Sequence, residues 1–162
     1  MKLIPSLVLS AALVWSVSPT TAQETAAPAI PGEVGTSMGA SNATMCYLAQ
    51  ALFGQLFDAD VSTEEKLRAV VLAAGGSKGG IDTAKDHLVK TGKYFNGADA
   101  ESLNALITLM ETLSAEAQAL VDHLKAKSEG GTNEAAIAEF KSKRATVAKD
   151  LVEFGFPLEM VE

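Results

Sequence analysis

Apolar residues recur at alternating spacings of three and four positions between Asp99 and Lys127, the longest uninterrupted helical pattern in the chain. This spacing keeps one stripe of an α-helix apolar along its whole length. The recurring positions are Leu103, Leu106, Met110, Leu113, Ala117, Leu120 and Leu124. At about 1.5 Å per residue, such a helix spans roughly 43 Å. We therefore expect this segment to be the spine around which the other helices pack.

A second series of the same period occupies Ile137–Phe154, in a helix that we expect Thr132 to cap. One of its core positions holds Arg144, which has no acidic residue three or four positions away on its own helix. In an antiparallel hairpin about residues 129–131, facing residues have numbers with a nearly constant sum, and Arg144 then faces Glu116. We predict an ion pair between these two residues that fixes the register of the hairpin. The alternative is an anion or ligand site inside the bundle.

Residues 45–57 are apolar on almost every side of a helix, which predicts a helix that is buried on most sides. It lies either at the centre of the bundle, which we favour, or under a partner protein. Ser62 and Glu65 form a capping box at the start of the next helix. We expect glycines to end that helix in a mobile loop over residues 75–80.

A further helix is expected over residues 81–94, and Asn96–Gly97 should turn the chain into the spine helix. Plentiful Ala, Leu, Glu and Lys, and the lack of alternating apolar positions, argue against strands. The fold class that we predict is all-α, a four- to five-helix up-and-down bundle.

The first 22 residues have the features of a cleaved signal peptide. Lys2 supplies a positive start, residues 7–17 form an apolar run, and Thr20–Ala22 are small. We therefore expect an exported protein, either periplasmic or secreted. Residues 23–42 are rich in Pro, Gly and other small residues without any period, which predicts a disordered leader. Residues 43–162 would then form a single helical domain.

Charge and cysteine content exclude several classes of function. The 162-residue chain carries a net charge of −7 and lacks the clustered Lys and Arg that phosphate binding needs, so we expect no nucleic-acid partner. No segment after the signal peptide is long and apolar enough to predict a membrane span. Cys46 is the single cysteine, which excludes an internal disulfide. Its apolar neighbours predict a buried, unreactive thiol.

Three groups of residues resemble metal or cofactor sites, but each pattern is incomplete. Alternate oxygen-bearing residues begin at Asp58 as in a calcium loop, yet Thr63 and Ala69 replace the glycine and the bidentate acid that the loop needs. His87 and His123 have no second ligand four positions on, so we expect exposed residues at the edge of apolar stripes. Since C-x-x-C-H is also absent, we predict no metal and no cofactor.

Without a catalytic motif, the function that we predict is that of a noncatalytic binding or protein-interaction module, with a protein partner or a second copy of the chain. The apolar tail is its candidate contact: Phe154, Phe156, Leu158, Met160 and Val161. The tail could instead fold back to close the bundle. The main alternative function is a bundle that binds a small ligand, noncovalent haem or metal between its helices. An enzyme whose site is not visible in the sequence ranks third.

Overall fold

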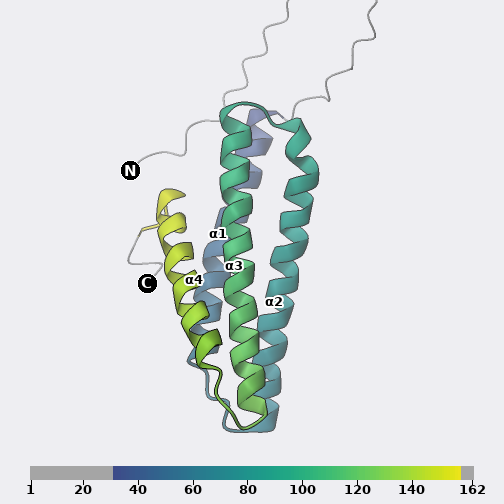
Figure 1. Ribbon diagram of the computed structural model, residues 1–162. Helices are drawn as coiled ribbons and strands as arrows, with labels where there is room; N and C mark the ends of the chain where they lie inside the picture. The colour runs from purple at the N-terminus through teal and green to yellow at the C-terminus, as the bar shows by residue number, and fades with distance from the viewer. Residues whose placement is uncertain (1–30, 158–162) are drawn as a thin grey trace, which may run out of the picture.

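The computed structural model describes residues 31–157, which form an all-α bundle of four helices without strands. Consecutive helices alternate in direction, so that the α2–α3 turn lies at one end and the other two connections at the opposite end (Figure 1). The predicted up-and-down bundle is therefore confirmed. The elements are α1 (Gly32–Phe57), α2 (Glu64–Thr91), the short 3₁₀ turn η1 (Gly92–Tyr94), α3 (Ala98–Ser128) and α4 (Glu134–Glu153).

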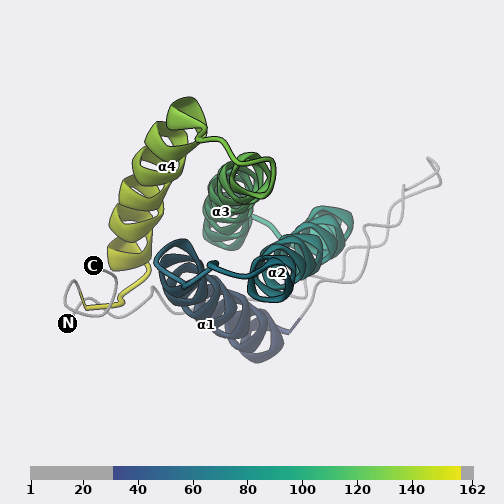
Figure 2. The ribbon, with the colours of Figure 1, turned by 90° about the horizontal axis from the view of Figure 1, so that it is seen from below.

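Helix α3 is the spine of the bundle, as its apolar period predicts. It packs against all three other helices, and Figure 2 shows it between α2 and α4 with α1 on the remaining side. Met110, Leu113 and Leu120 are fully enclosed in the core. The turn before α3 also lies at the expected place, because Gly97 adopts a positive φ of 56°, a conformation that side chains rarely allow.

Helix α4 packs along α3 as an antiparallel hairpin. Its buried residues Phe140, Val147 and Leu151 lie at the predicted apolar positions. The predicted cap is off by one residue, since the Asn133 side chain, rather than that of Thr132, accepts a hydrogen bond of 3.0 Å from the Ala136 amide. The helix ends at Glu153, and Gly155, with a φ of 95°, allows the chain to turn away from α4.

The predicted loop over residues 75–80 is wrong, because α2 continues through all of it as one helix. Glycine lowers helix stability by about 1 kcal/mol relative to alanine. Here Ala74, Ile81 and Leu88 bury one side of α2 against the core, and this packing outweighs the weak helix preference. The N-cap of α2 is Thr63 rather than Ser62, since the Thr63 hydroxyl accepts from the Lys66 amide at 3.3 Å.

Helix α1 begins at Gly32, eleven residues before the expected start of order near Ala43. The second part of the expected leader is thus helical, because Gly35 and Ala43 are buried and Met38 packs against the hydrophobic core. Residues 23–30 and the expected signal peptide lie outside the described residues. Helix α1 is also not central, since Leu48 on its outer side is 60% exposed.

Candidate functional site

A polar cluster lies where α1, α3 and α4 meet, and it contains the predicted ion pair. Arg144 Nη1 donates to Glu116 Oε1 over 3.4 Å and to the carbonyl oxygen of Gln50 over 2.7 Å. In return, the Gln50 side-chain amide donates to the carbonyl oxygen of Arg144 over 3.0 Å. The expected contact across the hairpin is therefore present, and a pair of hydrogen bonds joins it to α1.

Space for the Arg144 guanidinium comes from Gly54 on α1, which the sequence pattern did not reveal. A Cβ atom at Gly54 would lie 2.8 Å from Nη2 and 3.0 Å from Cζ of Arg144. Both distances are shorter than van der Waals contact, so a larger residue would displace the guanidinium. Ala117, the residue after Glu116 on α3, lies fully buried in the core.

Glu116, the acid of this cluster, is fully buried. Its side chain has no exposed surface, whereas 24% of the Arg144 side chain is exposed. Burial raises the pKa of Glu116 to about 7, and the nearby positive charge of Arg144 opposes that rise. The second carboxylate oxygen, Oε2, has no hydrogen-bond partner among the described residues. Nη1 of Arg144 donates inward to both Gln50 and Glu116, an arrangement that suits a pair fixing the register of α1, α3 and α4.

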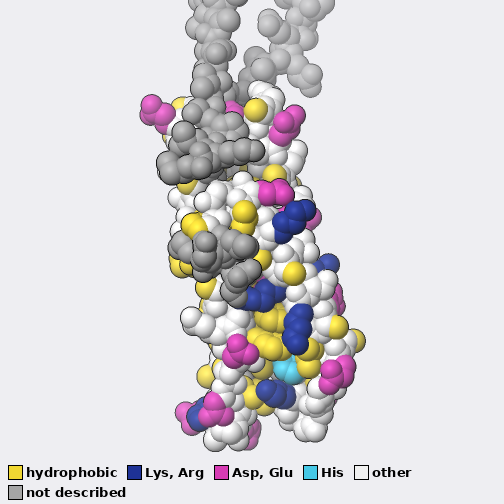
Figure 3. All heavy atoms as spheres, turned by 90° about the vertical axis from the view of Figure 1, so that its left-hand side faces the viewer, with side chains coloured by type: hydrophobic (Ala, Val, Ile, Leu, Met, Phe, Trp, Pro, Cys, Tyr) yellow, Lys and Arg dark blue, Asp and Glu magenta, His cyan; other side chains and the backbone are white. Residues whose placement is uncertain are grey.

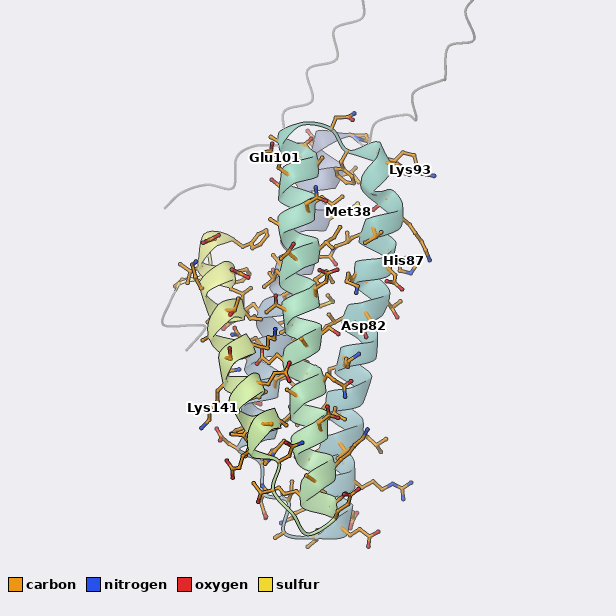
Figure 4. All side chains as sticks on the ribbon, in the orientation of Figure 1. Met38, Asp82, His87, Lys93, Glu101 and Lys141 are labelled. Carbon is orange, nitrogen blue, oxygen red and sulfur yellow. The ribbon has the colours of Figure 1, made fainter. Side chains whose placement is uncertain are left out.

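His123 is buried, which corrects the expectation of an exposed boundary residue. It is 6% exposed, and its ring centre lies 5.4 Å from that of Phe57, which stacks on Phe140 at 4.6 Å. Burial lowers the pKa of His123, which favours the neutral imidazole. His87 is exposed as expected and lies on the outer side of α2 (Figure 4). Within residues 31–157, no three candidate ligands gather as a metal site would require.

Asp60, in the acidic turn before α2, has hydrogen-bond partners that give it a structural role. Asp60 accepts hydrogen bonds from the Ser62 amide and the Lys66 ammonium, and these bonds hold the pKa of its carboxyl well below the usual range. Asp60 thus supports the turn into α2.

Cys46 is fully buried, and burial raises the pKa of its thiol to about 12. A thiol of so high a pKa is a poor nucleophile at neutral pH.

Two of the five candidate tail residues fall within the described part of the chain, and both contact the bundle. The Phe156 ring stacks on Tyr47 of α1 with 5.0 Å between ring centres. Phe154 lines a cavity between α1 and α3. These contacts agree with the fold-back alternative for Phe154 and Phe156. Leu158, Met160 and Val161 lie outside the described residues.

A further apolar surface lies on α1 and α2. Between these helices runs an open groove of about 470 Å³. It is lined by Ser41, Thr44, Met45, Leu48, Ala49, Leu52, Ser77, Gly80 and Ile81. Glu33 is the single charged residue in the 26 residues of α1. This stretch without charges, already visible in the sequence, is the signal that could have revealed the surface.

Next to the groove, the outward side of α2 forms what we call the glycine face. It consists of the exposed residues Ala69, Leu72, Ala73, Gly75, Gly76, Gly79 and Gly80. Leu72 projects from it with 66% of its surface exposed. The face shown in Figure 3 differs, since Lys and Arg side chains lie there beside a hydrophobic strip that contains a histidine. The two sides of the bundle therefore offer different surfaces to a partner.

No family model, no curated protein and no solved structure matches this chain. None of the helices within residues 31–157 combines the length and the apolar character needed to cross a membrane. The case for a function therefore rests on the chain's own residues.

Proposed function

We propose that this protein is a noncatalytic interaction module that associates through the glycine face of α2 and the adjoining α1–α2 groove, and that the occupant of this surface is a second copy of the chain. The observation that carries the proposal is the set of four exposed glycines beside Leu72, on a glycine face whose seven residues carry no charge. Charged residues are depleted at the centres of protein interfaces.

The four glycines are not needed by the isolated chain. A Cβ atom built at Gly75, Gly76, Gly79 or Gly80 would meet no other atom within 4 Å. Alanine would therefore fit at each position and would stabilise the helix by about 1 kcal/mol per residue. Glycine is instead favoured where another backbone approaches closely. A second helix lying along the glycine face accounts for these residues.

The glycine face is complementary to itself, as a symmetric dimer requires. It carries a projecting side chain, Leu72, and a depression at Gly76, Gly79 and Gly80 on the same side of one helix. In an antiparallel pair with Gly76 facing Gly79, Leu72 of each copy lies opposite the exposed Thr83 of the other copy, one helical turn from Gly79. Gly80 also lines the groove, so the contact continues toward Leu48 on α1.

Charges at the two ends of α2 favour an antiparallel arrangement of the copies. With Gly76 of one copy facing Gly79 of the other, Glu65 faces Lys90 and Arg68 lies beside Asp86 across the interface. All four of these charged residues are exposed. A parallel arrangement would instead place each of these charges against its own counterpart, which is unfavourable. Charge complementarity therefore supports a second copy as the occupant.

Sedimentation equilibrium of the purified protein tests this proposal. We expect a concentration-dependent dimer, which Leu72→Glu converts to a monomer. Val152→Glu is the matched control, because Val152 is an exposed aliphatic residue on α4. Lys90→Glu should weaken the dimer, and adding Glu65→Lys should restore it. A monomer up to millimolar concentration, or equal effects of Leu72→Glu and Val152→Glu, would refute the second copy as the occupant.

We also propose that the protein is exported, on the basis of its first 22 residues. Lys2, the apolar run over residues 7–17 and the small residues Thr20–Ala22 support this proposal. Intact-mass measurement of the protein purified from its own host should give a chain that begins at Gln23. A chain that retains Lys2 would contradict cleavage.

A further inference from the structure

A small apolar cavity lies at the end of the bundle where α2 turns into α3. It encloses about 50 Å³ and is lined by the first half of α1, the first turns of α3, Leu88 of α2 and two aromatic residues, Phe95 and Phe154. Leu103 and Leu106 of α3 are buried beside it. Gly35 and Gly39 of α1 also line the cavity and contribute no side chains to fill it.

One carboxylate lies in the lining of this cavity. Asp99, in the first turn of α3, is 8% exposed. Its backbone amide donates to the Asn96 carbonyl oxygen over 3.2 Å. None of the three ion pairs formed among residues 31–157 involves Asp99, and Lys93, the nearest lysine before it in sequence, lies over the Tyr94 ring. Asp99 therefore brings a carboxylate to the lining of an otherwise apolar cavity, and no ion pair within residues 31–157 occupies it.

We propose that this cavity binds a short alkylammonium ligand, with the ammonium group against Asp99 and the hydrocarbon chain among Leu88, Leu103 and Leu106. A carboxylate accepts hydrogen bonds from an ammonium group and balances its charge. Phe95 and Phe154 also line the cavity, and aromatic rings of this kind can attract a cation. Since one water needs about 10–15 Å³ of such space, the cavity has room for roughly three to five water-sized groups, which suits a chain of few carbons.

The methyl groups of methionine allow a direct binding test on the wild-type protein by NMR. Met38 lines the cavity, and Figure 4 labels it in the upper part of the bundle. Met45 lines the α1–α2 groove instead. Titration with n-butylammonium should shift the Met38 methyl resonance to saturation and leave that of Met45 unchanged. The uncharged analogue 1-pentanol should bind about tenfold more weakly, since it lacks the charge-assisted hydrogen bond, and pentanoate should not bind.

Two variants separate the charge of the site from its space. Asp99→Asn should abolish the preference for n-butylammonium over 1-pentanol. Glu101→Gln, which neutralises an exposed acid on the same turn (Figure 4), should leave that preference intact. Gly39→Leu keeps Asp99 but fills the cavity, because a Cβ atom at Gly39 meets nothing within 4 Å. It should prevent binding of both probes.

Comparison of n-butylammonium, 1-pentanol and pentanoate on the wild-type protein tests the proposal even if a variant fails to fold. Equal affinity for n-butylammonium and 1-pentanol, or equal shifts at Met38 and Met45, would overturn it. A preference for the ammonium that persists in folded Asp99→Asn would also overturn it. Because Met45 reports on the groove, failure here is distinguishable from failure of the proposed dimer.

Discussion

The α3–α4 hairpin and the α1–α2 hairpin belong to one bundle but differ in what lies between and around their helices. Between α3 and α4, large side chains such as Phe140 and Leu120 fill the space, and the pair of Arg144 and Glu116 crosses it. Between α1 and α2 an open groove remains, and the adjoining side of α2 carries glycines. One hairpin is therefore complete within the chain, whereas the other leaves apolar surface that a further molecule can cover.

Removal of the Glu116 carboxylate should have the largest effect on stability. At pH 8, Glu116→Ala leaves Arg144 without its acid and with a quarter of its side chain exposed. We expect a loss of about 3 kcal/mol in the free energy of unfolding, since breaking a buried ion pair from one side is costly. Urea denaturation measures it, with the exposed Glu111→Ala as control. Equal losses for the two variants would show that Arg144 is fully solvated.

The double variant Glu116→Leu with Arg144→Met tests what the pair contributes. Replacing both charges by apolar side chains removes their desolvation cost together with their attraction. We expect stability within about 1 kcal/mol of the wild type, measured by the same denaturation. A loss as large as that of Glu116→Ala would show that the pair itself stabilises the hairpin, rather than fixing its register.

The raised pKa of Glu116 predicts a pH dependence with a definite sign. Burial raises it from 4.5 to about 7, so the folded protein binds more protons than the unfolded chain between these values. The stabilisation is present below pH 4.5 and is lost as pH rises toward 7. Relative to Glu116→Gln, the wild type should lose about 2 kcal/mol over this range. Denaturation at several pH values checks this, and a constant difference would contradict it.

Glycine-to-alanine substitutions should have opposite signs where α1 packs against Arg144 of the α3–α4 hairpin and on the open outer side of α2. Gly54→Ala places a methyl group against the guanidinium of Arg144, which hydrogen bonds hold in place. We expect a loss of about 1 kcal/mol, the cost of overpacking less the gain in helix preference. Gly76→Ala meets no atom within 4 Å and should gain about 1 kcal/mol. Thermal denaturation at low protein concentration measures both.

The same two substitutions can be made in the Arg144→Met variant. This variant lacks the guanidinium, so Gly54→Ala should no longer destabilise the protein there. Gly76→Ala should behave alike in both backgrounds, since Gly76 lies on the outer side of α2, away from Arg144. If both substitutions had the same sign in the wild type, the contrast between the filled space around Arg144 and the open outer side of α2 would be wrong.

The local pattern of apolar residues determined much of the structure of the α3–α4 hairpin. The three-four spacing predicted the buried side of α3, and the short connection after Ser128 made α4 its antiparallel neighbour. In such a hairpin the register follows from residue numbers alone, because two helices of equal rise run past each other from a common turn. The contact between Arg144 and Glu116 could therefore be located from the sequence.

Tertiary structure alone decided the features that depend on distant segments. Residues 75–80 have a weak helix preference, yet they stay helical because Ala74 and Ile81 on either side pack into the core. Gln50 and Gly54 join Arg144 from a helix 90 or more residues earlier, and Asp99 becomes buried only where α1 covers the start of α3. Periodicity within one helix records which side is apolar, but it does not record which residues of another helix meet that side, since that depends on how all four helices pack together.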